Sequence, residues 1–377
     1  RGSHVSYRLS EDGFRTLASG DLPLKGGRVE VAGSLDRPGF LRCDLTWAAG
    51  DDTVKAVAAC GFAVESIRPT GRLPEDYSRF WREASVELVR IPVDPRLEEV
   101  VVDDLPGARR YRVSLASVGG GRVFGWLTLP PGDGPFPAVL AVPGAGVGRT
   151  AKGSAYARDG FAVFSINVHG IEPDREDEYY ERIKNGPMGG YDYLHYGKQD
   201  PYHFYFRRVI QDCMRALDYM CSRDDIDTTR IGMMGSSQGG FLSLMTASAD
   251  KRIKGLVASV PGLCDHTGSL YGRAAGGPQL LDDVTGDATA RVVRTLSYYD
   301  AALAAQLIKA PALLGIGFLD AVCPPTTVYA AYNNLAGCKA VENFETGGHG
   351  HGSPEGWGKR SRAWLLEKLN ERSAVKK

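Results

Sequence analysis

Hydrophobic and polar positions follow two different patterns along this chain of 377 residues, and the change comes near residue 70. Before it, short alternating runs are separated by Gly, Pro and Asp, as is typical of antiparallel strands. These runs are Arg28–Val31, Leu41–Trp47 and Lys55–Val64. We therefore expect residues 5–70 to form a small antiparallel β-sandwich domain. It is either a packing or oligomerisation module or a sugar-binding module, and the single tryptophan, Trp47, favours the first of these.

After residue 70 the apolar spacing lengthens. Residues 74–81 begin an amphipathic helix, so that residues 71–97 are expected to form a linker helix segment. From residue 98 to residue 377 strands come first and then alternate with helices, which predicts an α/β domain with a mostly parallel sheet flanked by helices. The expected strands are Val100–Asp103, Arg109–Ser117, Arg122–Leu129, Ala138–Val142, Phe161–Asn167, Ile231–Met234, Ile253–Val260, Ala312–Gly317 and Ala340–Phe344.

A serine stands in a glycine-rich turn between the strand Ile231–Met234 and an apolar helical run. The turn reads GSSQGG, and Ser237 has glycine two residues before and two residues after it, whereas Ser236 has Met234 two residues before. A strand, a G-x-S-x-G turn and a helix form the nucleophile elbow of the α/β-hydrolase fold. Ser237 is therefore the candidate nucleophile.

The other two members of a Ser-acid-His triad should follow in that order along the chain. Asp320 comes just after the buried strand Ala312–Gly317, and His349 lies in a glycine-rich loop after the last strand. In this arrangement His349 is the base and Asp320 orients its ring. Asp265, which follows another strand, is the competing acid, and His349 with His351 could instead be metal ligands.

The same fold places the oxyanion hole. Its first donor is the backbone N–H after the nucleophile, that of Gln238. The second should come from the glycine-rich loop Val142–Gly146, after the first parallel strand.

Composition narrows the function classes. The 45 basic and 45 acidic residues cancel, which speaks against nucleic acid as a partner, and no apolar run is long enough to cross a membrane. We expect no cofactor and no metal. Residues 1–4 read as an expression-tag remnant, and the Val that follows suggests a trimmed N-terminus, which slightly favours export to the periplasm or secretion. The seven unpaired cysteines would instead suit the cytoplasm.

Several segments resemble the acetyl xylan esterase and cephalosporin-C deacetylase family. They are YFRRVIQDCMRALDY at residues 205–219, DTTRI at 227–231, GSSQGG at 235–240, VPGLCD at 260–265, DAVCPP at 320–325 and PEDYSRFW at 74–81. The resemblance covers the chain from about residue 70 onward. It implies an α/β-hydrolase that deacetylates small acetylated sugars such as xylo-oligosaccharides through Ser237, Asp320 and His349, with the second oxyanion amide at Ala145.

The chain departs from the family pattern at three places. His169-Gly170-Ile171 replaces the family's R-G-Q motif, Gly350 replaces the Glu after the catalytic His, and the amino-terminal sandwich is an addition. We expect a homo-oligomer. Residues 171–206 hold seven of the seventeen tyrosines and could line either the pocket or a subunit interface.

Two other functions fit the same residues. One is a peptidase of the prolyl oligopeptidase type on the same fold, which would need an acidic site that recognises an amine. The other is a carbohydrate-binding protein without hydrolytic activity, which would keep a disused triad. The intact set of Ser237, Asp320 and His349 argues against the second.

Overall fold

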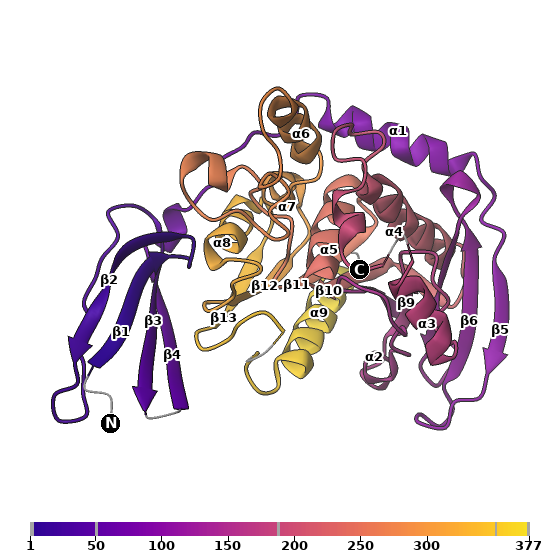
Figure 1. The fold of residues 1–377 in the computed structure, drawn as a ribbon. Coiled ribbons are helices and arrows are strands. Elements are labelled where there is room, and N and C mark those ends of the chain that lie inside the picture. Colours follow the sequence, from indigo (N-terminus) through magenta and orange to yellow (C-terminus); the bar gives the residue numbers. More distant parts are fainter. Residues whose placement is uncertain (1–3, 50–51, 187–188, 351–352, 375–377) are drawn as a thin grey trace.

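The computed structural model describes residues 4–49, 52–186, 189–350 and 353–374. A nine-stranded sheet with helices on both faces forms the larger part, and a four-stranded sheet lies beside it, on the side of helix α8 (Figure 1). Within the described residues, no helix is both long and apolar enough to cross a membrane.

The large sheet has the strand order β13-β12-β11-β10-β8-β9-β7-β6-β5. Neighbouring strands from β13 to β9 run parallel, and β7, β6 and β5 add antiparallel pairs at one edge. The strands are β5 (Arg96–Val100), β6 (Arg109–Ala116), β7 (Arg122–Leu129), β8 (Phe136–Val142), β9 (Ala162–Asn167), β10 (Ile226–Ser236), β11 (Ile253–Ser259), β12 (Ala312–Gly317) and β13 (Lys339–Phe344). The predicted α/β-hydrolase architecture is confirmed.

The helices bury both faces of this sheet. They are α1 (Tyr77–Val89), α2 (Ser154–Arg158), α3 (Asp177–Lys184), α4 (Tyr205–Cys221), α5 (Gln238–Ala249), α6 (Ala288–Ser297), α7 (Ala301–Ala304), α8 (Pro325–Asn334) and α9 (Trp357–Ala374). The main core lies on the face that α4, α5 and α8 cover, and a smaller core lies under α9. β9 and β12 are buried at every position, as central strands covered on both faces must be.

The amino-terminal region is one antiparallel sheet of order β2-β1-β3-β4, where a sandwich with two layers of strands was expected. Its strands are β1 (His4–Glu11), β2 (Arg15–Pro23), β3 (Gly39–Ala49) and β4 (Asp52–Phe62). The segment 24–38 has little regular structure and lies across one face, where Gly33 is in close contact with the side chains of Leu9 and Leu41.

Two predicted strands are wrong. Arg28–Val31 forms no strand, because the glycines at 26 and 27 close a tight turn at a single bridge between Lys25 and Arg28 and the chain then crosses the sheet. The strand expected at Val100–Asp103 lies at Arg96–Val100, where most side chains are exposed and carry no apolar pattern. The proposed domain boundaries near residues 70 and 97 stay predictions.

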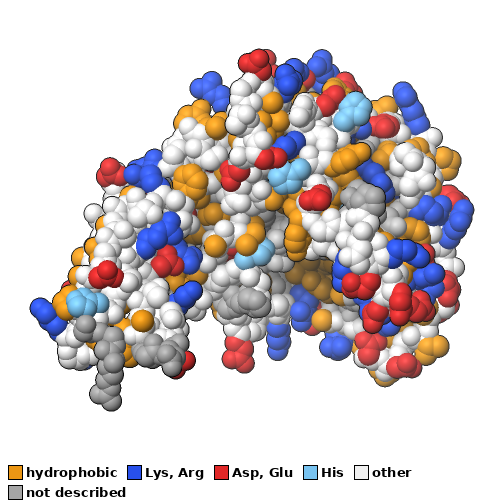
Figure 2. Space-filling view, viewed as in Figure 1, with side chains coloured by type: hydrophobic (Ala, Val, Ile, Leu, Met, Phe, Trp, Pro, Cys, Tyr) orange, Lys and Arg blue, Asp and Glu red, His pale blue; other side chains and the backbone are white. Residues whose placement is uncertain are grey.

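The small sheet is docked on the loop that follows β12. Phe40 is fully buried, and its ring centroid lies 4.9 Å from that of Phe318 and 5.5 Å from that of Tyr329. Arg42 donates a hydrogen bond to the carbonyl oxygen of Leu319 at 3.1 Å. Charged side chains gather where this sheet faces the large domain, and the lower part of the sheet stands away from that domain (Figure 2).

We predict that Phe40→Ala loosens this docking. Removing a buried aromatic ring costs about 3–5 kcal/mol, so the midpoint of denaturation by urea should fall clearly. Phe14→Ala is the matched control, because Phe14 is 49% exposed and its loss should change stability by less than about 0.5 kcal/mol. Equal midpoints for the two variants would show that Phe40 does not hold the sheet.

Candidate active site

Ser237 has a strained backbone at the junction of β10 and α5. Its φ is 58° and its ψ is −120°, a conformation that L-residues rarely adopt. Its N–H donates to the carbonyl oxygen of Ser259 at 2.9 Å, and its own carbonyl oxygen accepts from the N–H of Gly262 at 3.1 Å. These two bonds hold the serine at the end of the strand with its side chain clear of the sheet.

The flanking glycines are required by space. A Cβ atom on Gly235 would lie 2.5 Å from the carbonyl carbon of Gly239, and a Cβ on Gly239 would lie 2.6 Å from the carbonyl oxygen of Val142. Both of these neighbouring atoms belong to the backbone, so they cannot move aside as a flexible side chain could. Only glycine therefore fits at positions 235 and 239. The turn therefore explains the G-x-S-x-G spacing.

The structure brings the three predicted triad residues into one hydrogen-bonded chain. Ser237 Oγ lies 2.9 Å from His349 Nε2, and His349 Nδ1 lies 2.8 Å from Asp320 Oδ2. The other carboxylate oxygen, Oδ1, accepts from the N–H groups of Val322 and Cys323, both at 2.8 Å. An imidazole with its proton on Nδ1 would present the lone pair of Nε2 to the serine hydroxyl, which is the geometry that a general base needs.

The loops that carry the acid and the base are bonded to each other. Leu319, next to Asp320, donates its N–H to the carbonyl oxygen of Gly347 at 2.9 Å, and Phe318 donates to that of Phe344 at 3.0 Å. Asp320 is buried, whereas the side chain of His349 is 24% exposed. The pair of bonds fixes the distance between the ends of β12 and β13.

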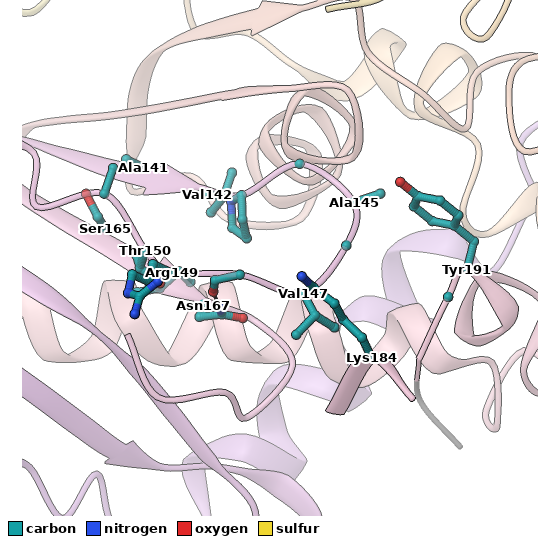
Figure 3. A pocket seen from close by; sticks show the side chains of 17 residues that line it. Ala141, Val142, Ala145, Val147, Arg149, Thr150, Ser165, Asn167, Lys184 and Tyr191 are labelled. Carbon is teal, nitrogen blue, oxygen red and sulfur yellow. Dashed lines mark hydrogen bonds between the residues drawn. The ribbon is translucent and has the colours of Figure 1, made fainter. Parts of the chain in front are cut away.

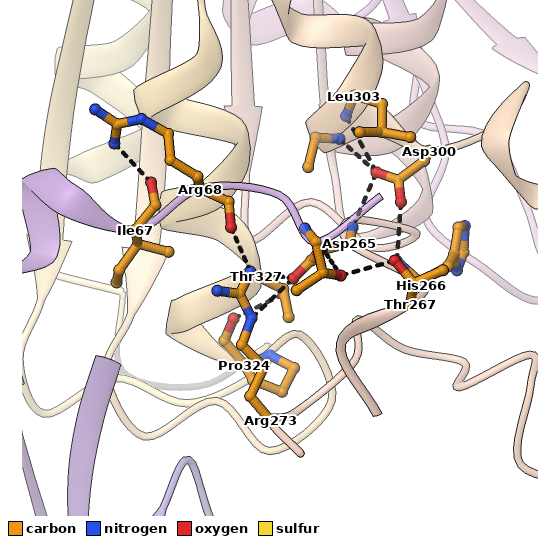
Figure 4. Close-up of polar contacts among 12 residues, drawn as sticks. Ile67, Arg68, Asp265, His266, Thr267, Arg273, Asp300, Leu303, Pro324 and Thr327 are labelled. Carbon is orange, nitrogen blue, oxygen red and sulfur yellow. Dashed lines mark hydrogen bonds and ion pairs between the residues drawn. The ribbon is translucent and has the colours of Figure 1, made fainter. Parts of the chain in front are cut away.

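Asp265, the competing acid, has a different role in the structure (Figure 4). Its Oδ1 accepts from the backbone N–H of Thr70 at 2.6 Å and from the Thr70 hydroxyl at 2.7 Å, and its Oδ2 forms an ion pair with Arg273. It therefore ties down the segment that leaves the small sheet. The geometry favours Asp320 as the partner of His349.

The metal hypothesis for the histidines has less support from the geometry. Both ring nitrogens of His349 lie within hydrogen-bond distance of Ser237 and Asp320. Among the described residues, three potential metal ligands come together once, and they are Asp320, Cys323 and His349. His351 lies outside the described residues.

The two predicted sources of oxyanion donors lie side by side. Gln238 is the first residue of α5 and is buried, and the loop with Gly144 and Ala145 packs where α5 begins. The N-terminus of a helix also carries partial positive charge, which favours a developing oxyanion. That the amides of Gln238 and Ala145 stabilise an oxyanion stays a prediction.

A network of neutral side chains lies behind these donors. The Tyr193 hydroxyl accepts from the N–H of Gly146 at 3.2 Å and donates to Gln238 Oε1 at 2.8 Å. Gln238 Nε2 lies 3.5 Å from His169 Nε2, and His169 Nδ1 lies 2.7 Å from the Tyr205 hydroxyl. Tyr193 thus joins the loop after β8 to the residue after the nucleophile.

His169 is uncharged in this network at neutral pH. Burial lowers the pKa of its ring to about 4, and the nearby positive charge of Arg208 acts in the same direction. The residues that replace the expected R-G-Q motif therefore supply hydrogen bonds without a charge. The sequence showed the replaced motif at residues 169–171, but it did not point to Tyr193 or Tyr205.

A large cavity opens along the loop after β8 (Figure 3). Its volume is about 710 Å³, and it is lined by residues 141–151, by Ser165, Ile166 and Asn167 at the end of β9, and by Lys184, Gly190 and Tyr191. Residues from the tyrosine-rich segment 171–206 thus do line a cavity. The alternative that the segment forms a subunit interface stays open.

Comparisons with known proteins give one consistent result. The model of the acetyl xylan esterase (AXE1) family matches residues 63–365. Acetyl esterase Axe7A of Xylanibacter ruminicola is 32% identical over 340 residues, which cover 89% of this chain and 76% of that protein. The structure of an acetyl xylan esterase from Paenibacillus sp. R4 is similar with a TM-score of 0.68 at 31% identity, over 81% of this chain and 97% of that chain. Acetyl xylan esterase 1 from Thermoanaerobacterium sp. JW/SL YS485 gives a TM-score of 0.69 at 25% identity over the same shares.

We predict that Asp320→Asn lowers kcat for an activated ester by about 10⁴-fold, because an amide favours the wrong imidazole tautomer. Asp265→Asn is the control, since it removes a buried partner of Arg273 and should lower the melting temperature while kcat stays within about threefold. Steady-state kinetics and circular dichroism on both variants test this. A loss of kcat in folded Asp265→Asn with active Asp320→Asn would move the acid to Asp265.

We predict that Tyr193→Phe lowers kcat about tenfold with little change in KM. The loss should be smaller than the 10²- to 10³-fold typical of deleting an oxyanion donor, because Tyr193 acts by positioning the donors. Tyr196→Phe is the matched control, because Tyr196 is 69% exposed. An increase in KM at constant kcat would instead indicate a role in binding the substrate.

Proposed function

The chain belongs to the acetyl xylan esterase (AXE1) family, and from this premise we propose that it removes acetyl groups from small acetylated carbohydrates such as xylo-oligosaccharides, with Ser237, His349 and Asp320 as the catalytic triad. Family membership makes it a carboxylic ester hydrolase of the acetyl esterase type. The observation that carries the assignment of roles is the 2.9 Å contact between Ser237 Oγ and His349 Nε2, at a serine held in a strained turn.

The reaction follows from this geometry. Ser237 Oγ attacks the acetyl carbonyl carbon while His349 Nε2 takes the hydroxyl proton, and the buried Asp320 carboxylate stabilises the resulting imidazolium. The backbone amides of Gln238 and Ala145 donate to the oxyanion. When the tetrahedral intermediate collapses, His349 gives its proton to the sugar oxygen, which leaves as an alcohol.

The second half returns the enzyme to its starting state. The exposed edge of His349 admits water, which loses a proton to Nε2 as its oxygen attacks the acetyl-serine ester. Collapse of the second intermediate releases acetate and restores the serine hydroxyl. Each half uses the same base and the same oxyanion donors.

The peptidase alternative has less support. A peptidase that recognises a substrate amine needs an acidic subsite, and none of the residues that line the large cavity beside the oxyanion loop is acidic. Two of them, Arg149 and Lys184, are cationic and would repel an amine. A homo-oligomer and the absence of a nucleic-acid partner remain predictions from the sequence.

The space behind the oxyanion loop leaves no room for a long acyl chain. Val147, His169, Ile171, Ile183 and Tyr193 enclose only about 20 Å³ there. This is about the room that a single water molecule needs. Longer acyl chains would have to displace the buried network around Tyr193.

We predict that kcat/KM falls steeply from p-nitrophenyl acetate to the butyrate and octanoate esters, because overfilling a packed site is unfavourable. Ser237→Ala supplies the background for every ester and should lower turnover by roughly 10⁶-fold with an unchanged circular dichroism spectrum. A preference for octanoate would indicate a lipase-like groove and contradict the proposed acetyl specificity.

A further inference from the structure

The cavity along the loop after β8 has no role in the chemistry described so far. Gly144, Ala145 and Gly146 form part of its wall, and the same loop is the proposed source of an oxyanion donor. Its volume of about 710 Å³ falls in the range of small-molecule sites. The cavity and the proposed oxyanion donor at Ala145 therefore share one loop.

The part of the cavity wall that the loop after β8 forms carries few large side chains. A Cβ atom built on Gly146 or on Gly148 would meet nothing within 4 Å, so the loop leaves open space beside it. Ala145 adds only a methyl group. At Gly146 and Gly148 the loop therefore presents no side chain to a ligand in the cavity.

Tyr191 supplies an aromatic surface at the mouth of this cavity. Its ring stands opposite Ala145 (Figure 3) and is 61% exposed, whereas the neighbouring Tyr193 is buried. An exposed aromatic ring beside an open cavity suits the apolar face of a sugar ring, since it adds contact area at little cost in conformational freedom.

The charged side chains of the lining are both cations. Lys184 and Arg149 both contribute to it, and their acidic partners, Glu181 at 2.8 Å and Asp177 at 2.6 Å, are not among the lining residues. Exposed ion pairs of this kind contribute little stability, so a ligand carboxylate can compete for the same cations. Thr150 Oγ1, which is buried in the lining, has no hydrogen-bond partner among the described residues.

We propose that this cavity binds the carbohydrate part of the substrate, and that its preferred occupant is an acetylated oligosaccharide that also carries a carboxylate, with a sugar ring on Tyr191 and the carboxylate at Lys184 and Arg149. The proposal rests on the proposed esterase function and names the substrate class for the same site. According to this proposal, Lys184 and Arg149 make the enzyme prefer acidic oligosaccharides over neutral ones.

Three substrates separate the parts of this proposal. They are p-nitrophenyl acetate, a neutral acetylated xylo-oligosaccharide, and an acetylated xylo-oligosaccharide of the same length that bears a glucuronic acid. Tyr191→Ala should raise KM for both oligosaccharides by up to about tenfold, the value of one aromatic contact, and leave p-nitrophenyl acetate unchanged. Lys184→Met should raise KM for the acidic substrate alone, and added salt should have the same effect on the unmodified enzyme.

Matched controls come from residues outside the lining. Tyr196→Ala and Lys359→Met change an exposed tyrosine and an exposed lysine, and neither should alter any of the three KM values. Turnover of p-nitrophenyl acetate by each variant reports that it is folded.

Each outcome decides a definite point. An unchanged KM for the oligosaccharides in Tyr191→Ala would overturn the sugar site, and equal KM values for acidic and neutral substrates in the unmodified enzyme would overturn the carboxylate preference. Failure of the proposed esterase function would be recognised separately, because the unmodified enzyme would then hydrolyse none of the three acetates.

Discussion

The backbone of Ser237 is the constraint on which the site depends. A serine at φ 58° can join a strand to a helix only if the chain on both sides comes very close, and the approach of Gly235 to Gly239 leaves no room for a Cβ atom. The strain is balanced by bonds to Ser259 and Gly262, which belong to β11 and the loop after it. Ser237, the proposed nucleophile, is therefore held by the central strands of the sheet, and Asp320 and His349 reach it from the next two strands.

The small sheet is structurally joined to the acid. Phe40 packs on Phe318 and Arg42 bonds to Leu319, and these two residues directly precede Asp320. The sheet thus covers the segment that sets the position of the carboxylate, and it does so through one buried ring and one guanidinium. Disturbance of this sheet would reach Asp320 by way of the loop after β12.

The three triad residues could be predicted from the sequence because the motifs that mark them are local. A strand, a glycine-bounded serine and a helix lie within a few residues of one another, and the order of Asp320 and His349 follows from the order of the strands. Tyr193 could not be found in this way. Its hydroxyl meets Gln238, 45 residues further along the chain, and only the packing of the tyrosine-rich segment under the loop after β8 brings them together.

The same distinction explains the errors in the fold. The buried central strands of the large sheet carry continuous apolar runs and were placed within a few residues. β5 lies at a sheet edge with mostly exposed side chains, so no apolar pattern marked its position. In place of the expected second layer of strands, the irregular segment 24–38 covers the small sheet. Any apolar segment can cover Leu9 and Leu41, so a second layer of strands is not required.

The replacement at His169 changes where charge lies around the reaction. A buried ring with a pKa near 4 adds no positive charge behind the proposed oxyanion donors, which are backbone amides beside Tyr193 and Gln238. The cations Arg149 and Lys184 lie instead in the cavity across the loop. The field from these outer cations acts on a sugar bound in the cavity more than on the acetyl group, because Coulomb interactions weaken with distance and with solvent. The proposed function thus assigns recognition of the carbohydrate to the cavity side of this loop and stabilisation of the transition state to its backbone amides.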